Sequence, residues 1–462
     1  MQKSLFFLSF MLLLSSTLTG SEGEKSDLFN GRNLDGWEVL NGDATFEARD
    51  GMIVGISETN TPNTFLATTE DFTNFVLEYE MKMDEGLNSG VQIRSKSLDS
   101  YNNGRVHGPQ VECEDTKRGW AGGIYDEARM GWRYPLEYNP EAKTAFKKGE
   151  WNTFKVVAFD NHIMTWVNGV PAANLVEEET ETGFVALQVH GIGNNKDLAG
   201  KEIKWKNFQI REISKDDFKE HKETKAPEVS YLKNQLTESE KADGWKLLWD
   251  GKTTDGWRGA KLDDFPEKGW SINDGILRVH DSGGEEAAHG GDIVTEKKYE
   301  NFIMEVDFSL TKGANSGIKY FVDTELNEGE GSSIGCEFQI LDDEHHPDAK
   351  QGVEGNRTLA SLYDLITANG LEFNPNLPTK KYVNGYDHWN RARIVVDGKD
   401  VQHYLNGIKV VEYKRDTQMW RALVAYSKYS DWPDFGENKR GHLLLQDHGD
   451  KVEFKNIKIK EL

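Results

Sequence analysis

The chain has 462 residues, which is enough for two ordinary domains and too long for one typical all-β sandwich. Hydrophobic residues make up 37% and charged residues 29%, a composition typical of globular rather than disordered proteins. The formal net charge of −23 argues against nucleic acid as a partner, because phosphate recognition needs a basic surface, and it is compatible with neutral small molecules.

The first segment of the chain has the pattern of a secretory signal. Lys3 gives a basic start, an apolar run covers residues 5–14, and small residues follow at 15–21. The run is too short to span a bilayer comfortably, and no other stretch is apolar enough to do so. The sequence therefore predicts a signal peptide over residues 1–22, a periplasmic or secreted protein, and no stable membrane insertion.

The remainder of the chain repeats itself. Segments 25–213 and 241–462, called here the first half and the second half, carry the same motifs in the same order. The matching motifs include Asn88-Ser89-Gly90 with Asn315-Ser316-Gly317, Trp151-Asn152 with Trp389-Asn390, Asn168-Gly169 with Asn406-Gly407, and Leu187-Gln188 with Leu445-Gln446. Residues 214–240 between them are rich in Lys and Glu and predict a linker with room for one short helix.

Within each half, apolar residues recur at every second position. Residues 302–309 alternate in this way, and the Asn-Gly pairs at 168–169 and 406–407 lie between alternating runs, as in β-hairpins. Long helical periodicity is absent. The pattern predicts an all-β fold of many short strands, a sandwich or a barrel, in which Cys113 and Cys336 are buried free thiols.

Polar side chains also recur at period two, where apolar residues would serve a structural strand equally well. The second half has Glu337 with Gln339, Gln446 with His448, and Lys319 after Asn-Ser-Gly. The corresponding positions of the first half hold Gln110, Glu112, Gln188, His190, Gln92 and Arg94. A histidine beside a carboxylate suits proton transfer near neutral pH, and a lysine, an arginine or a bound divalent metal ion suits stabilisation of an oxyanion. Each of these residues taken alone could simply lie on a solvated strand face. The repetition of the pattern in both halves favours a functional site.

The order of these motifs resembles the 3-keto-disaccharide hydrolase family, also described as 3-keto-glucoside-1,2-lyase/2-hydroxy-glucal hydratase. The resemblance is carried above all by Glu-x-Gln-x-x-Asp at 337–342 and Leu-Gln-Asp-His-Gly at 445–449, and it covers nearly all of both halves. It implies two tandem concanavalin A-like jelly-roll domains. The second half is nearer to the common pattern, because the first half reverses the Glu/Gln order at 110–112 and has Val189 in place of Asp447.

The resemblance implies an exported enzyme that cleaves 3-keto-glycosides. A ketone at C3 acidifies the C2 proton, so that a base can remove it, the group at C1 is expelled, and water adds back to the glucal. On this interpretation the second half supplies Glu337 and His448 for proton transfer, Lys319 or Lys428 for the oxyanion, and Gln339, Gln446, Tyr363 and Asn315 for the sugar. The first half would supply Glu112, His190 and Arg94 for catalysis and Gln110, Gln188, Tyr125 and Asn88 for the sugar. The resemblance assigns no definite cofactor, and a divalent metal ion is an alternative holder of the oxyanion.

Two other functions stay open. A conventional laminarinase-like glycosidase needs carboxylates spaced along one strand; Glu305 and Asp307 fit, but Leu310 stands where a third acid is required. A non-catalytic carbohydrate-binding protein is the second alternative, because jelly rolls often only bind, and the first half suits that function better than the second.

Overall fold

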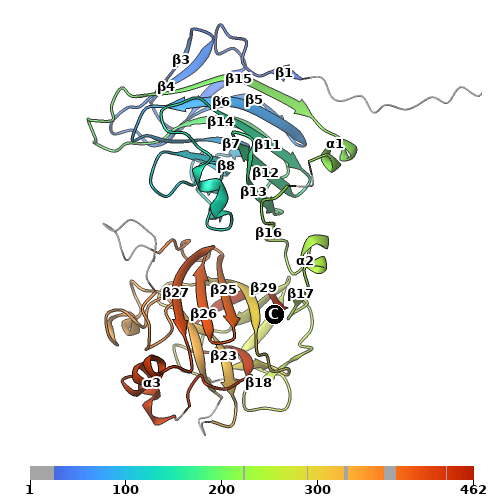
Figure 1. The fold of residues 1–462 in the computed structure, drawn as a ribbon, viewed down its shortest axis with the longest axis vertical. Coiled ribbons are helices and arrows are strands. Elements are labelled where there is room, and N and C mark those ends of the chain that lie inside the picture. Colours follow the sequence, from blue (N-terminus) through green and yellow to red (C-terminus); the bar gives the residue numbers. More distant parts are fainter. Residues whose placement is uncertain (1–24, 222–223, 289, 327–330, 369–380, 433) are drawn as a thin grey trace, which may run out of the picture.

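The computed structural model of the chain describes residues 25–221, 224–288, 290–326, 331–368, 381–432 and 434–462. The predicted signal peptide lies outside these residues. Strands dominate, and two sets of sheets follow one another along the chain (Figure 1). None of the helices in the described ranges is long and apolar enough to cross a membrane.

The described part of the first half contains two facing sheets. One has the order β16 (Val229–Ser230), β13 (Val170–Val176), β12 (His162–Val167), β11 (Asn152–Phe159), β6 (Phe75–Met83), β15 (Glu202–Glu212), β4 (Met52–Ile56) and β3 (Thr45–Arg49), with β1 (Ser26–Asp27) on β15. The other has the order β10 (Gly131–Tyr134), β9 (Ile124–Glu127), β8 (Val106–Glu114), β7 (Asn88–Ser97), β14 (Gly183–Val189), β5 (Thr64–Phe72) and β2 (Trp37–Leu40). The short helix η1 (Pro140–Thr144) follows β10.

The second half repeats this architecture over its described residues. Its larger sheet has the order β19 (Trp270–Asn273), β20 (Ile276–Val279), β29 (Val452–Glu461), β22 (Phe302–Leu310), β25 (Asn390–Asp397), β26 (Asp400–Leu405) and β27 (Ile408–Lys414), with β17 (Trp245–Leu247) on β29. Its smaller sheet has the order β18 (Trp257–Gly259), β21 (Ile293–Thr295), β28 (His442–Leu445), β23 (Asn315–Asp323) and β24 (Ile334–Leu341). The helices are η2 (Pro347–Lys350), α3 (Gln418–Ala425) and η3 (Lys428–Asp431).

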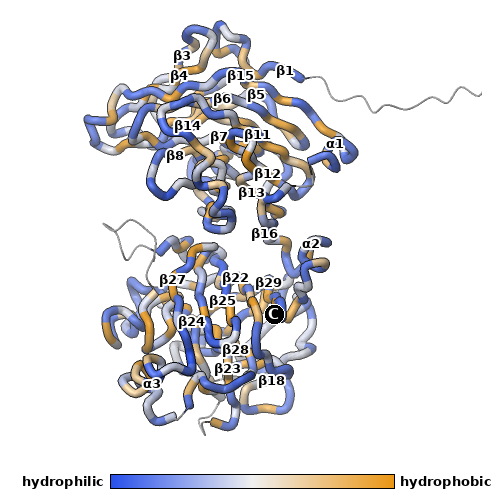
Figure 2. The backbone as a smooth tube through the Cα atoms, viewed as in Figure 1, coloured by the Kyte–Doolittle hydropathy of each residue, from blue (hydrophilic) through white to orange (hydrophobic). Residues whose placement is uncertain are grey.

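The alternation read from the sequence explains why these strands pair as sandwiches. Phe302, Met304 and Phe308 of β22 are buried in the core, and hydrophobic segments run through the sheets of both halves in Figure 2. The Asn-Gly pairs that join β12 to β13 and β26 to β27 have positive φ at both residues, as a tight hairpin turn requires. The predicted all-β fold of two jelly-roll sandwiches is confirmed, and Cys113 and Cys336 are buried free thiols as expected.

The segment predicted as a linker is more structured than expected. Besides β16, it contains α1 (Lys215–Lys219) and α2 (Glu238–Ala242), and both helices begin with a capping box, at Ser214 and Thr237. These boxes were the sequence signal for the helices, because Ser or Thr is followed three residues later by an acid. β16 then pairs in parallel with β13, so the chain adds to the first sandwich before it enters the second.

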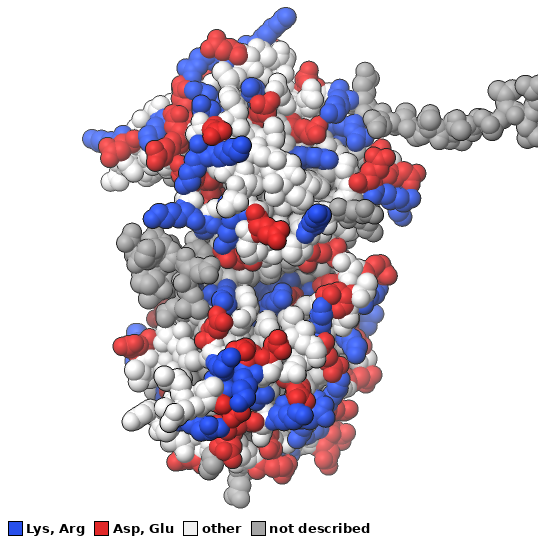
Figure 3. Space-filling model, in the orientation of Figure 1, with Lys and Arg blue, Asp and Glu red and all other residues white. Residues whose placement is uncertain are grey.

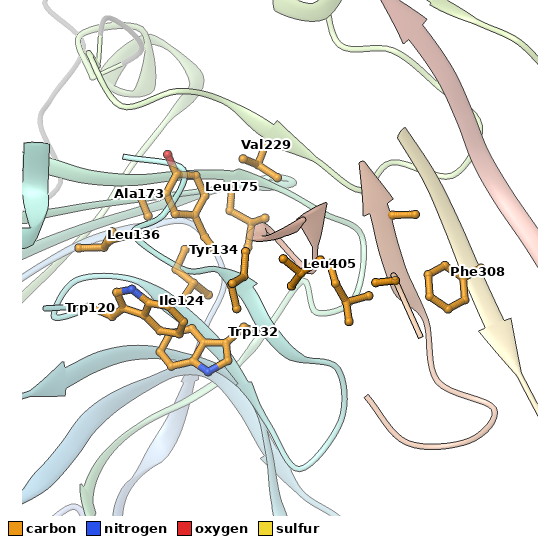
Figure 4. Packing of buried hydrophobic residues seen from close by; sticks show 14 of the residues in the cluster. Trp120, Ile124, Trp132, Tyr134, Leu136, Ala173, Leu175, Val229, Phe308 and Leu405 are labelled. Carbon is orange, nitrogen blue, oxygen red and sulfur yellow. The ribbon is translucent and has the colours of Figure 1, made fainter. Parts of the chain in front are cut away.

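The two halves are in direct contact. Acidic and basic side chains are mixed over the face seen in Figure 3. Figure 4 shows buried apolar side chains of both halves that belong to one cluster, from Trp120 and Trp132 to Leu405. The Tyr231 ring lies between two guanidinium groups, 3.5 Å from that of Arg133 in the first half and 3.8 Å from that of Arg391 in the second. The two sandwiches therefore share one continuous buried cluster rather than meeting through a free linker.

Candidate active site

A pocket of about 100 Å³ opens on the face of the β23–β24 sheet that is turned away from the core. Such a volume is below the usual range for ligand pockets and suits part of one sugar ring. All the candidate residues of the second half line it: Glu337, His448, Lys319, Lys428, Gln339, Gln446, Tyr363 and Asn315. The structure thus brings this predicted group together in full.

The strand register explains why the charged residues of the pocket meet. Phe338 of β24 points into the core, so Glu337 and Gln339 project from the opposite face. Lys319 of β23 is the direct cross-strand partner of Glu337. The Glu337 carboxylate lies over the Cα atom of Gly317, where a Cβ atom would come within 2.3 Å of Glu337 Oε1, so this position needs glycine.

Glu337 is a buried carboxyl group among cations. Burial raises the pKa of Glu337, and the positive charges of Lys319 and Lys428 oppose that rise without cancelling it. The Gln339 amide lies 2.9 Å from Glu337 Oε1, in the orientation in which its nitrogen donates to the carboxylate. A raised pKa and a fixed orientation are the properties of a group that takes up and releases a proton near neutral pH.

Lys319 is held charged by a second acid. Burial alone would lower the pKa of Lys319, but Asp292 and Glu337 outweigh it, so the net shift is upward. Lys319 Nζ lies 3.4 Å from Asp292 Oδ2, and the other oxygen of Asp292 accepts from the Asp447 N–H at 3.0 Å. Asp292 is fully buried, and burial raises its pKa to about 6.

Two loops complete the pocket. Tyr363 pairs through its N–H with the Glu337 carbonyl, and its hydroxyl donates to Asp348 at 2.6 Å. Lys428 begins η3, and its ammonium lies 4.1 Å from the centre of the Tyr363 ring. Desolvation in the pocket lowers the pKa of Lys428 from its ordinary value, and Glu337 opposes that shift. The loop after β27 that carries Lys428 spans residues 415–441, whereas only residues 177–182 join the matching strands of the first half.

Gln446 and His448 follow β28 on the same face. Gln446 Oε1 and His448 Nδ1 are buried, and neither has a hydrogen-bond partner in the described ranges. Buried polar atoms without partners are rare in folded proteins, and here they border a pocket. They are therefore available to bind hydroxyl groups or to exchange a proton.

The first half has the same sheet with different groups on it. Gln92 and Gln110 face each other across β7 and β8, where Lys319 and Glu337 face each other in the second half. Leu187 pairs with Leu66, just as Leu445 pairs with Ile293 in the second half. Phe65, the residue before Leu66, therefore occupies the position of Asp292. The three charged residues of the second half are therefore replaced in the first half by two amides and a phenyl ring.

Glu112 is not the positional counterpart of Glu337, with which it was matched by residue type. The register sets Glu112 opposite Gly90, in the way that Gln339 lies opposite Gly317. The reversed Glu/Gln order in the sequence therefore reflects a real exchange of the two positions on the strand.

Most of the other first-half candidates do gather around Glu112. Asn88 Nδ2 donates to Glu112 Oε1 at 2.6 Å, and Gln110 Nε2 donates to Glu112 Oε2 at 3.1 Å. Tyr125 pairs with Gln110 across β8 and β9, and Gln188 is fully buried on β14. Asn88, Gln110 and Glu112 are thus hydrogen-bonded to one another, whereas both amide atoms of Gln188 are buried without a partner in the described ranges. Burial together with Glu114 raises the pKa of Glu112 to about 7.

The placement of Arg94 and His190 differs from the prediction. Arg94 follows a bulge in β7 and has a φ of 47°, so its side chain leaves the predicted face. Its guanidinium instead donates to the carbonyls of Thr73 and Asp160 at 2.7 and 2.6 Å. His190 is exposed, and its Nδ1 contacts the Gly191 carbonyl. Arg94 therefore cannot hold an oxyanion beside Glu112.

Replacing Glu112 by Gln is expected to stabilise the protein at alkaline pH. The pKa of Glu112 is higher in the folded chain than in the unfolded one, so rising pH destabilises the fold between about pH 4.5 and 7. E112Q removes this penalty, which amounts to at most about 3 kcal/mol. Thermal unfolding at pH 5 and pH 8 measures it: the gain in Tm should be larger at pH 8, and an equal effect at both values would contradict this account.

Acidic, histidine and tyrosine side chains contact one another at the end of β24. His345 Nδ1 lies 3.0 Å from Asp342 Oδ2 and 2.9 Å from the Tyr386 hydroxyl. Asp342 Oδ2 also accepts from the Gly313 N–H at 2.7 Å. No group of three or more His, Cys, Asp and Glu side chains in the described part of the chain is arranged to hold a metal ion.

Several residues of the site were not found from the sequence. Glu286, Ser333 and Tyr429 line the pocket, and Asp292 lies behind it and holds Lys319. Asp292 lies directly before β21, and its contact with Lys319 depends on the order of the strands in the sheet. A polar residue at the start of an apolar strand was the one available signal.

Known proteins resemble the chain along most of its length. The family model described as the 3-keto-alpha-glucoside-1,2-lyase-like domain matches residues 24–211 and again residues 244–460. The 3-keto-disaccharide hydrolase of Bacteroides thetaiotaomicron is 38% identical over 241 residues, which cover 48% of this chain and 79% of that protein.

Two solved structures from Parabacteroides distasonis ATCC 8503, both provisionally assigned as glycosyl hydrolases, also match. The first is 32% identical and covers 50% of this chain and 99% of its own, with a TM-score of 0.42. The second is 26% identical and covers 47% of this chain and 99% of its own, with a TM-score of 0.34.

Proposed function

Because both halves of the chain belong to the 3-keto-alpha-glucoside-1,2-lyase-like domain family, we propose that this protein cleaves 3-keto-glycosides by elimination at C1 and C2 followed by hydration. One observation carries the proposal. In the second-half pocket a buried carboxyl group, Glu337, lies beside a buried ammonium, Lys319, with the amides of Gln339 and Gln446 beside them. These groups match a reaction that removes a proton and develops charge on a neighbouring oxygen.

Glu337 is the base in this proposal. The C3 ketone acidifies the C2 proton, and when Glu337 takes that proton the electron pair passes to the C3 oxygen. The ammonium of Lys319 or Lys428 balances the charge on this oxygen. The electron pair then returns to form the C1–C2 double bond as the C1–O bond breaks, and His448 protonates the leaving oxygen. Water finally adds its hydroxyl to C1 and a proton to C2, so that the net reaction is hydrolysis.

The second half carries the reaction. The first half has Gln92 and Gln110 at the positions of the charged pair and Phe65 at the position of Asp292. An amide neither takes a proton from carbon nor supplies a full positive charge. Glu112, the remaining carboxyl group of this face, lies opposite Gly90 and not opposite a cation, so the first half lacks the pairing of a base with an oxyanion holder.

Glu305 and Asp307, the two acids that a glycosidase of this fold would use, are held in ion pairs with basic side chains. Arg391 lies 2.6 Å from Asp307 and 3.5 Å from Glu305, and Lys458 lies 3.1 Å from Glu305. Burial would raise the pKa of Glu305, but these cations lower it to about 2. A glycosidase acid needs a raised pKa, so this pair suits structure rather than general acid catalysis.

We also propose export to the periplasm or the medium, on the signal pattern of residues 1–22.

Matched chromogenic substrates test the function. The full-length protein is expected to release nitrophenol from a 4-nitrophenyl 3-keto-glucoside and not from the corresponding ordinary glucoside. In D2O the released 3-keto-glucose should carry deuterium at C2, beyond the exchange seen when the product is incubated without protein. Release from the ordinary glucoside would favour direct glycoside hydrolysis, and sugar binding without release from either would leave a carbohydrate-binding protein.

A further inference from the structure

We propose that the cavity between the two halves is a second binding site, and that it takes a neutral sugar. The cavity has a volume of about 490 Å³, within the range of ligand pockets. Its walls include Tyr138 of the first half, Glu240 of the segment 214–240 that joins the halves (the connector), and Glu305 of β22. The molecule narrows between the two halves in Figure 3. It is distinct from the candidate active site, because Glu305 and Glu337 project from different sheets of the second sandwich.

Most of the charged side chains that line the cavity are paired within it, and Glu137 pairs with Lys143 just outside it. Lys458 contacts both Glu240 and Glu305, and Arg393 Nη1 lies 3.2 Å from Glu305 Oε1. Lys458 and Glu305 are buried, so a charged ligand that displaced either partner would leave the other uncompensated. Hydroxyl groups can instead accept from the cations and donate to the carboxylates without breaking a pair. The cavity therefore selects a polar ligand that has no net charge.

Aromatic rings form the other walls. Tyr404 of β26, Trp245 of β17 and Tyr138 line the cavity, and all three side chains are partly exposed. The C–H face of a pyranose ring packs on such flat apolar surfaces, while its hydroxyl groups reach the paired charges at its edge. The combination of aromatic walls with neutralised polar groups matches a sugar ring better than an aliphatic or an ionic molecule.

The site needs both halves and the connector. Tyr138 also packs on Gly407, where a Cβ atom would come within 2.6 Å of the tyrosine ring. The first half, which lacks the charged group of the candidate active site, thus acquires a function as one wall of a sugar site. Because the second site would bind sugars that carry no C3 ketone, it extends the proposed function rather than depending on it.

Binding of unoxidised sugars to the full-length protein tests this inference. Methyl β-glucoside and cellobiose serve as probes, followed by saturation-transfer NMR and by titration of tryptophan fluorescence. Tyr404→Ala and Trp245→Ala are each expected to weaken binding at least about tenfold, because each removes a stacking surface. Both side chains are partly exposed, so neither substitution hollows out a core.

The controls separate the two sites. Glu337→Gln in the active-site pocket and Tyr426→Ala at a tyrosine that is 93% exposed should leave binding of both probes unchanged. Tyr404→Ala should keep full turnover of the 3-keto-glucoside, so a failure here differs from a failure of the proposed reaction. Loss of probe binding in Glu337→Gln with retention in Tyr404→Ala would overturn the inference, as would the absence of binding by the native protein at any soluble probe concentration.

Discussion

Glu337→Gln is expected to lower kcat on the 3-keto-glucoside by about 100-fold or more, because a positioned base contributes roughly 10²–10⁴ to such a step. Glutamine keeps the size of the side chain and an oxygen to accept the hydrogen bond of Gln339, but it cannot take the C2 proton. The same variant should lose the incorporation of deuterium at C2. Turnover by the native protein should rise with pH through the pKa of Glu337, which lies above the ordinary range of glutamate.

Glu112→Gln is the matched control for this prediction. It removes the buried carboxylate of the first half, which lies on the corresponding strand but opposite glycine instead of opposite a cation. Turnover should stay within a factor of two of the native value, since this half lacks the lysine and its acid. Full activity in Glu337→Gln would eliminate Glu337 as the base, and a matching loss in Glu112→Gln would place catalysis in both halves.

Arg391→Met is expected to lower the free energy of unfolding by about 3–5 kcal/mol, the effect of leaving a buried carboxylate unpaired. Arg391 is 2% exposed and makes two hydrogen bonds to Asp307, of 2.6 and 3.0 Å. It also donates to the Ser230 carbonyl at 2.8 Å, which ties the connector to the second sandwich. Urea unfolding followed by circular dichroism measures the loss.

Two further variants show whether the loss arises from the unpaired charge. Combining Arg391→Met with Asp307→Leu removes both ions and should recover much of the lost stability. Arg421→Met breaks the ion pairs of an exposed guanidinium with Asp416 and Glu437 and should leave the free energy of unfolding almost unchanged. If the single Arg391 variant unfolds no more easily than the Arg421 variant, the buried pair contributes nothing to stability.

The second-half site was predictable because it follows strict strand geometry. Glu337 and Gln339 are two residues apart on one strand, so period-two alternation places them on one face without knowledge of the fold. Asp292 could not be assigned in this way. It lies next to β21 and contacts Lys319 of β23, and β28 lies between these two strands in the sheet. Sheet order is a long-range property that a local pattern does not encode.

Arg94 shows where alternation fails. A bulge after Gln92 adds a residue to β7 and turns the following side chain away from the predicted face. Composition likewise identified the segment 214–240 but not its structure. Its low apolar content favoured a linker, whereas the capping boxes and the pairing of β16 make it part of both sandwiches.

The contacts of the Tyr231 ring couple the unfolding of the two sandwiches. The ring lies between a guanidinium of each sandwich, so the sandwiches cannot separate without breaking at least one of the two contacts. The loss of one sandwich would also expose the apolar cluster that it shares with the other. We therefore expect the molecule to unfold as one cooperative unit, with a single melting transition that reports on both copies of the repeat.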